Sequence, residues 1–263
     1  MDNRKLNELV SYVYNAEKEK REITKITADI YPELTIEEGY LVQEEWIKRK
    51  VKEGAKIIGP KMGITSEAKM KQMNVTDPIY GYVFDDMVIE AGQSISLSDY
   101  IHPKIEPEIG FILERDLEGP GVTTLDVLLS TAFVFPALEI IDSRYEKFNF
   151  TLPDVIADNT SAAGVVFGTC LRKPVELELD VIGVTLSING KIKSFGAGAA
   201  VLGHPANSVA RLANMLAKKG EKVRANQPIL TGGMTAAVPL SPGDAVQAKY
   251  GGLGDVSFFV YPS

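Results

Sequence analysis

The sequence predicts an α+β protein in which a mainly helical N-terminal region precedes a mixed or mainly antiparallel β core. In the first third of the chain, apolar residues recur at helical spacing. From about residue 56 onward, short apolar runs are separated by glycine, proline, aspartate and serine, a pattern typical of strands and turns. Strands and helices do not alternate regularly, which argues against a doubly wound parallel sheet. We therefore expect a helical region over residues 1–75 and a β-rich domain over residues 76–263.

Two helices are expected in the N-terminal region. The first covers residues 4–16 and the second residues 36–53. In the second helix, Thr35 is the expected N-cap, Glu38 completes a capping box and Gly54 follows the last turn. The apolar residues that predict the buried faces are Leu6, Leu9, Val10, Val13 and Tyr14 in the first helix, and Tyr40, Leu41, Trp46, Ile47 and Val51 in the second.

The clearest strand signal is a hairpin. Strands over residues 184–188 and 191–195 are joined by Asn189-Gly190, the dipeptide that favours a type I′ turn. A second turn is expected over residues 241–244, between strands near 235–240 and 245–250.

Two further helices are expected to interrupt the β-rich part, over residues 124–131 and 206–219. The second has Pro205 in its first turn and Gly220 at its end. His204 is expected to neighbour its N-cap. The face expected to be buried carries Val209, Leu212, Ala213 and Leu216.

Composition narrows the class of protein. The net charge is −7, and no basic stripe is visible, so nucleic acid is not an expected partner. The single cysteine, Cys170, cannot form an internal disulfide, which fits a reducing, cytoplasmic setting. No apolar run approaches the roughly 18 residues of a membrane span, so no membrane association is expected.

Acidic residues at strand spacing are the main candidates for chemistry. Glu106 and Glu108 lie two residues apart, so in a strand their side chains project from one face about 7 Å apart. Glu139 lies within an apolar run, where a carboxylate needs a cation or hydrogen-bond donors. Together the three carboxylates would suit a hard divalent ion. Alternatively, Glu106 and Glu108 line a solvated strand face, and Pro107 marks an edge, a bulge or a strand start.

Lys61 and Asp142 are further candidates. Two glycines and a proline surround Lys61, so backbone can approach a ligand closely there, although an ordinary solvated lysine fits as well. Asp142 either forms an ion pair at a strand end or orients metal ligands from behind. The glycines of residues 196–201 begin like a dinucleotide-binding fingerprint but lack its third small residue, so a close-packed turn is expected instead.

Taken together, seven segments resemble the fumarylacetoacetate hydrolase superfamily, and within it the branch of 2-oxopent-4-enoate hydratases and 4-oxalocrotonate (2-oxo-3-hexenedioate) decarboxylases. They follow the family's order along nearly the whole chain. The segments are Lys61–Ser66, Pro78–Gly81, His102–Glu108, Glu139–Arg144, Ala157–Ser161, Gly196–Pro205 and Thr231–Gly233.

The resemblance implies a mixed β roll, barrel-like in form, with an N-terminal helical region and a β-rich catalytic domain. It places Glu106, Glu108 and Glu139 on ligands of Mg²⁺ or Mn²⁺, and Lys61 in the active site as a catalytic residue. Lys61 would add positive charge beside a developing enolate or deliver a proton to it. Asp142 would act from behind the metal ligands. The residues expected to bind substrate are Ser143, Asn159, Ser161 and Thr231.

The implied activity is that of a carboxy-lyase. Its substrate would be a 2-oxo dicarboxylic acid, 2-oxo-3-hexenedioate, which loses CO₂ to give 2-hydroxypenta-2,4-dienoate in catechol meta-cleavage. The competing reaction is hydration of 2-hydroxypenta-2,4-dienoate. A different class of protein, a non-catalytic partner subunit, is the other alternative. The resemblance also implies a homo-oligomer and a complex with the hydratase of the pathway.

Overall fold

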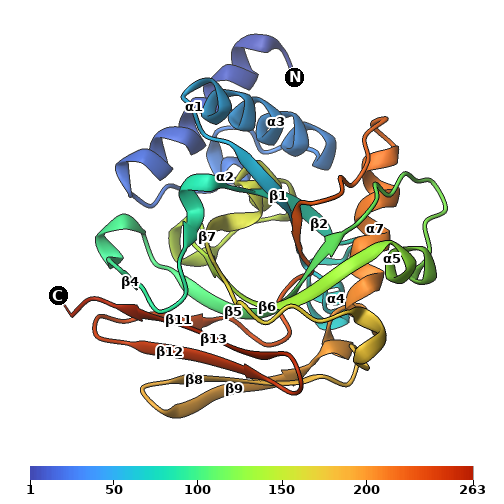
Figure 1. Cartoon of the computed structure of the whole chain (residues 1–263). Helices are drawn as coiled ribbons and strands as arrows, with labels where there is room; N and C mark the ends of the chain where they lie inside the picture. The colour runs from blue at the N-terminus through green and yellow to red at the C-terminus, as the bar shows by residue number, and fades with distance from the viewer. Residues whose placement is uncertain (263) are drawn as a thin grey trace.

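The computed structural model of the chain describes residues 1–262. It has three layers (Figure 1). Helices α1 and α3 pack on one side of a large curled sheet, and a smaller sheet packs on the other. The hydroxyl of Tyr250, in the smaller sheet, donates to the carbonyl oxygen of Ala137 in the large sheet at 2.7 Å.

The helices are α1 (Asn3–Glu19), α2 (Ile26–Asp29), α3 (Ile36–Lys52), α4 (Glu67–Met73), α5 (Thr124–Ser130), α6 (Leu152–Ala157) and α7 (Pro205–Ala217). The strands are β1 (Ile57–Gly63), β2 (Ile79–Phe84), β3 (Val88–Ile89), β4 (Ser94–Ile95), β5 (Lys104–Leu113), β6 (Thr131–Ile141), β7 (Ala162–Phe167), β8 (Gly183–Ile188), β9 (Lys191–Ala197), β10 (Pro228–Leu230), β11 (Val238–Pro239), β12 (Ala245–Tyr250) and β13 (Gly254–Val260).

The prediction of a mixed, mainly antiparallel β core is confirmed. In the large sheet the strand order is β2-β1-β10-β5-β6-β7-β3, with β11 also paired to β5. The smaller sheet has the order β4-β13-β12-β8-β9. Over residues 1–262, the parallel pairs are β1 with β10, β3 with β7, and β4 with β13, whereas all other pairs are antiparallel.

The predicted hairpin and turn are present, with one correction. Asn189 and Gly190 have φ angles of 54° and 74°, as a type I′ turn between β8 and β9 requires. The backbone N–H of Asp244 donates to the carbonyl oxygen of Ser241 at 3.2 Å, which closes the second turn. The strand expected before this turn is shorter than predicted, because only β11 forms, and it pairs with β5.

The long helices α1, α3 and α7 were predicted correctly, but part of the predicted buried face of α3 was wrong. The capping box of Thr35 and Glu38 is formed at the start of α3. Leu41 and Val51 were expected to be buried, but 46% and 47% of their surfaces are exposed. The buried face of α3 includes polar side chains such as that of Gln43, so an apolar pattern could not locate it fully.

Three short helices, α2, α4 and α6, were not predicted. They contain four, seven and six residues, and α4 buries none of its residues, so an apolar periodicity gives little signal in these segments. His204 is itself the N-cap of α7, because its side chain accepts a hydrogen bond from the backbone N–H of Ala206 at 3.1 Å. Among the helices of residues 1–262, none is both long enough and apolar enough to span a bilayer.

The N-terminal helices and the sheet share a core. Trp46 of α3 packs edge-on against Phe84 of β2, with ring centroids 5.7 Å apart. The buried amide of Gln43 donates to the carbonyl oxygens of Tyr80 at 2.9 Å and Ile156 at 3.1 Å. Strand β1 precedes the predicted boundary at residue 75, yet it pairs with β2 and β10 inside the large sheet. That boundary stays a prediction.

Replacing Gln43 by methionine tests whether helices and sheet unfold together. We expect Gln43→Met to lower the free energy of unfolding by about 2 kcal/mol, because two buried carbonyl oxygens lose their donor. A single transition should persist in a urea titration followed by circular dichroism. Gln93→Met, at an exposed position, is the control and should leave stability nearly unchanged. Two separate transitions would show that the helical region is an independent unit.

Candidate metal centre and active site

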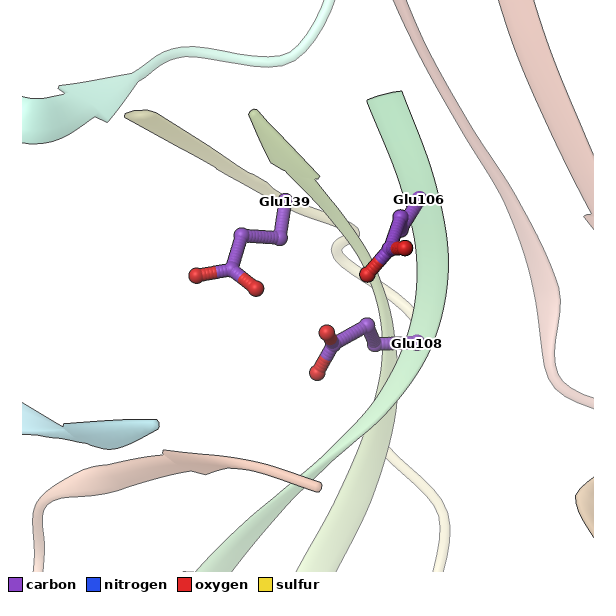
Figure 2. Close-up of side chains that lie close together, drawn as sticks. All are labelled: Glu106, Glu108 and Glu139. Carbon is purple, nitrogen blue, oxygen red and sulfur yellow. The ribbon is translucent and has the colours of Figure 1, made fainter. Parts of the chain in front are cut away.

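Three buried glutamates meet at the centre of the large sheet. Glu106 and Glu108 project from one face of β5, and Glu139 of β6 lies directly opposite Glu106 in the register of the two strands. One carboxylate oxygen of each lies within 4.8 Å of the others. Figure 2 shows the three side chains pointing toward one another. Their exposed fractions are 5%, 0% and 1%, so the predicted convergence is confirmed.

The alternative of a solvated strand face is therefore wrong, and so is the expected position of Pro107. Pro107 lies in the middle of β5, opposite Leu138 of β6. On the other side of β5, strand β10 pairs with residues 110–112 and strand β11 pairs with residues 104–105. The proline lies in the gap between these two short strands. Its missing N–H costs no ladder hydrogen bond there, while its carbonyl oxygen accepts from the backbone N–H of Met234 at 2.9 Å.

The carboxylates receive fewer donors than their burial demands. Oε2 of Glu108 accepts from the backbone N–H of Gly232 at 2.7 Å, and Oε1 of Glu139 lies 3.1 Å from Nζ of Lys61. Within residues 1–262, Oε1 of Glu108 and Oε2 of Glu139 are buried without a hydrogen-bond partner. Burial, and for Glu108 also the charge of Glu139, raises the pKa of both carboxyls.

A divalent cation fits this donor set. Unpaired carboxylate oxygens in a dry interior are costly, and a hard cation with oxygen ligands removes that cost. The residues that would hold it are Glu106, Glu108 and Glu139. No histidine or cysteine contributes to the group, so the chemistry favours Mg²⁺ or Mn²⁺ over zinc.

A cavity of about 540 Å³ opens beside the glutamates. Lys61, Lys69, Lys104 and Glu106 bring charge to its wall. Much of the remaining wall is apolar. The other lining residues are Gly63, Ile64, Gln72, Met73, Ile79, Ile141, Phe148, Asn149, Phe150, Val155, Thr160, Ser161, Ala236 and Ala237. The cavity is large enough for a small organic acid.

Lys61 and Lys69 pair with different glutamates. Lys61 of β1 is buried, lies beside Glu139 and donates to the carbonyl oxygen of Thr160 at 3.0 Å. Lys69 of α4 lies 3.0 Å from Oε1 of Glu106, and this carboxylate raises the pKa of Lys69. The alternative of a solvated Lys61 is thus wrong, since only 2% of its surface is exposed.

A strained loop supplies the carbonyl group that holds Lys61. Asn159, Thr160 and Ser161 have φ angles of 46°, 54° and 56°, an arrangement that non-glycine residues rarely adopt. The side-chain amide of Asn159 holds the loop, because it accepts from the backbone N–H of Tyr82 and donates to its carbonyl oxygen, each at 2.9 Å. The hydroxyl of Thr160 donates to the carbonyl oxygen of Tyr80 at 2.9 Å.

A buried ion pair fixes the start of this loop. Arg144 and Asp158 are paired through the guanidinium Nε, and the backbone N–H of Arg144 also donates to Asp158 at 3.2 Å. Burial raises the pKa of Asp158 to about 7, even though Arg144 acts in the opposite direction. The pair is therefore a structural anchor for the loop that follows it.

Of the four residues predicted to bind substrate, only Ser161 lines the described cavity. The side chain of Asn159 is used by Tyr82, as above. The hydroxyl of Ser143 accepts from the backbone N–H of Tyr145 at 3.1 Å, and that of Thr231 donates to the carbonyl oxygen of Ile109 at 2.7 Å. Asn159, Ser143 and Thr231 thus support the backbone around the site, and their contact with substrate stays a prediction.

Asp142 also acts on the backbone. Its carboxylate accepts from the N–H groups of Ile101 at 2.7 Å and His102 at 2.8 Å. Both donors lie just before β5, separated from it by Pro103. Asp142 thus fixes the entry of the strand that carries Glu106 and Glu108, and makes no described hydrogen bond to either glutamate or to Arg144 through its carboxylate. The expected ion pair is replaced by backbone capping.

Lys69, Lys104 and the backbone N–H of Gly232 were not predicted. For Lys104 a signal was available, because it continues the spacing of Glu106 and Glu108 on one face of β5. Lys69 reaches the site through the position of α4, and Gly232 through the order of strands in the sheet. Gly232 lies in the Thr231–Gly233 segment of the family resemblance, but no local pattern indicated that its N–H is a donor to Glu108.

Comparison with known proteins places the chain in a family. The family model described as Fumarylacetoacetate (FAA) hydrolase C-terminal matches residues 58–260. The chain is 47% identical to a 4-oxalocrotonate decarboxylase of Pseudomonas sp. (strain CF600), over 95% of this chain and 94% of that protein. It is 41% identical to a 2-oxo-hept-4-ene-1,7-dioate hydratase of Escherichia coli, over 92% of each.

A solved structure is also closely similar. The 4-oxalocrotonate decarboxylase from Pseudomonas putida G7, complexed with magnesium and adipate, superposes with a TM-score of 0.96. The sequence identity is 44%, and the match covers 99% of this chain and 98% of that one. The predicted mixed sheet with N-terminal helices is thus the fold of these proteins.

The cost of burying Glu108 can be measured directly. In the presence of a chelator at pH 8, we expect Glu108→Gln to raise the free energy of unfolding, because burial and the charge of Glu139 raise the pKa of the Glu108 carboxyl. A carboxyl whose pKa is raised by folding destabilises the folded state above its ordinary value. The difference should therefore vanish below about pH 4.5, the ordinary value, where the carboxyl is protonated in both states.

The matched control for this measurement is Glu114→Gln, at an exposed position just beyond β5. It should change stability by less than about 0.5 kcal/mol. If Glu108→Gln destabilised the chelated protein at pH 8, the buried carboxylate of Glu108 would not be unfavourable to the folded state, contrary to the inference above.

Proposed function

Because the chain belongs to the fumarylacetoacetate hydrolase family, we propose that it is a metal-dependent carboxy-lyase acting on a 2-oxo dicarboxylic acid. The proposed reaction converts 2-oxo-3-hexenedioate (4-oxalocrotonate) to 2-hydroxypenta-2,4-dienoate and CO₂ in catechol meta-cleavage. The observation that carries the proposal is the buried cluster of Glu106, Glu108 and Glu139 beside a lysine-lined cavity. Relatives called 4-oxalocrotonate decarboxylase, at 47% and 46% identity, support the choice of reaction.

The proposed cofactor is Mg²⁺ or Mn²⁺, held by Glu106, Glu108 and Glu139. Magnesium in the similar decarboxylase structure supports this assignment. When bound, the ion supplies Lewis-acid stabilisation of negative charge on a keto acid. The buried position of the glutamates excludes water from the far side of the site, so charge interactions there are strong.

Lys61 is the proposed catalytic residue. Its ammonium group lies 3.1 Å from Glu139 and lines the cavity, so it adds positive charge where an enolate oxygen develops. The carbonyl oxygen of Thr160 fixes its position. From this place Lys61 also holds a proton that can be delivered to the enolate. Ser161, which lines the same wall, is proposed to orient the substrate.

Decarboxylation and hydration place different demands on the cavity. Hydration needs an admitted water and a positioned general acid or base, whereas decarboxylation is favoured by a drier pocket. The side chains of Ile141, Phe148, Phe150 and Val155 form an apolar wall, which favours decarboxylation. Hydration is the second candidate, because hydratases at 41% and 37% identity are also relatives.

We further propose a cytoplasmic location, supported by a single cysteine in the chain. A homo-oligomer and a complex with the hydratase of the same pathway are proposed from the family resemblance, since the product of the decarboxylase is the substrate of the hydratase.

Metal binding should be visible without any assay of activity. With Mg²⁺ at 100 times its Kd, we expect the melting temperature to rise by roughly 5 °C or more, because a ligand of the native state stabilises it by about 2.7 kcal/mol. Glu108→Gln should abolish most of this shift and the turnover, whereas Glu114→Gln should retain both. A wild-type melting temperature independent of Mg²⁺ and Mn²⁺ would favour a non-catalytic partner subunit.

Two substrates separate the two enzyme candidates. Purified protein with Mg²⁺ should consume 2-oxo-3-hexenedioate and release CO₂, and its rate on 2-hydroxypenta-2,4-dienoate should be at least about a hundredfold lower, a difference of about 2.7 kcal/mol in activation free energy. Ultraviolet absorbance follows both conjugated substrates. Faster consumption of the dienoate would assign the chain to the hydratases.

A further inference from the structure

The cavity wall carries one lysine that no glutamate neutralises, and on the basis of the proposed function we propose that this residue, Lys104, binds the distal carboxylate of the substrate. In this role Lys104 determines the preference for dicarboxylic over monocarboxylic keto acids. The inference deepens the proposed function, because it concerns the end of the substrate remote from the glutamate cluster.

The position of Lys104 follows from the geometry of β5. Lys104, Glu106 and Glu108 occupy alternate positions and therefore project from one face, with neighbours about 7 Å apart. The carboxyl carbons of an extended six-carbon diacid lie roughly 6 Å apart, since each carbon–carbon bond is about 1.5 Å. A diacid with one end at Glu106 and Glu108 can thus place its other end near Lys104.

The pairing of the three cavity lysines distinguishes Lys104. Lys61 lies beside Glu139, and Lys69 lies beside Glu106. Lys104 has no carboxylate within salt-bridge distance among residues 1–262. Its described contact is the face of the Phe148 ring, 3.8 Å from Nζ to the ring centroid. The ring holds the ammonium group at the cavity without cancelling its charge.

The charge of the whole site agrees with a doubly charged ligand. The three lysines and the three glutamates cancel when all are ionised. A divalent ion then leaves two positive charges, which a dianionic keto dicarboxylate neutralises. A monocarboxylate would leave one positive charge in a partly buried cavity without a counterion, and that charge is the one on Lys104.

The distal carboxylate is also the leaving group, which fixes how Lys104 affects the kinetics. The bond between C5 and C6 breaks, its electron pair passes through the conjugated chain to the 2-oxo oxygen, and C6 leaves as neutral CO₂. An ion pair with Lys104 therefore stabilises the bound substrate more than the transition state. Loss of the charge should raise KM and should not lower kcat.

Two saturated ligands that differ only at the distal end test the inference. By calorimetry with Mg²⁺ present, we expect 2-oxoadipate to bind wild-type protein about tenfold more tightly than 2-oxohexanoate, as one charge-assisted hydrogen bond provides. Lys104→Met keeps an unbranched apolar side chain that is shorter by the ammonium group, and it should remove most of this ratio by weakening 2-oxoadipate alone. Lys104→Arg should retain the ratio. For turnover, Lys104→Met should raise KM about tenfold with kcat unchanged or higher.

Lys249→Met, at an exposed position on β12, is the control and should behave as wild type. An unchanged ligand ratio in Lys104→Met, or a tenfold fall in kcat at constant KM, would overturn the role of Lys104 and leave the proposed function standing. If neither ligand bound the wild-type protein in a Mg²⁺-dependent manner, the proposed function would fail, and the inference with it.

Discussion

The burial of three carboxylates at one point is the constraint on which the rest of the molecule depends. Carboxylates in a dry interior repel one another and lack water, so the surrounding elements have to supply positive charge and donors. Those groups come from separate parts of the chain: Lys61 from β1, Lys69 from α4 and the N–H of Gly232 from the segment after β10. The short strand β10 makes this assembly possible, because it lies between β1 and β5 and is paired to both.

The residues of the site that are marked by a pattern in their own segment were predictable, and those that depend on distant segments packing together were not. Alternation along a strand places Glu106 and Glu108 on one face, and an acid within an apolar run marks Glu139, so sequence alone indicated all three. Lys69 and Gly232 depend on which strands become neighbours, and that is decided by packing across the whole chain. The same distinction holds for the fold, where the Asn189-Gly190 hairpin followed from local turn chemistry but the position of β10 did not.

Several polar side chains that were predicted to bind substrate also satisfy the backbone around the site. Asn159, Ser143 and Thr231, which were expected to contact substrate, each form hydrogen bonds to backbone groups. A buried loop without regular pairing leaves backbone donors and acceptors unsatisfied, and short polar side chains are the groups that satisfy them. A polar residue beside an active site can therefore serve to satisfy backbone groups or to bind a ligand, and sequence alone does not distinguish these two roles.

The strained loop shows what this scaffold achieves. Three successive residues with left-handed backbone conformations are each unfavourable by of order 1 kcal/mol. Arg144 with Asp158 at the start of the loop, and Asn159 with Tyr82 along it, hold it in that conformation. The result is that the carbonyl oxygen of Thr160 faces Lys61 and fixes its ammonium group beside Glu139. A lysine held by a backbone carbonyl keeps its position when the charge around the glutamates changes, whereas one held by carboxylates alone would follow them.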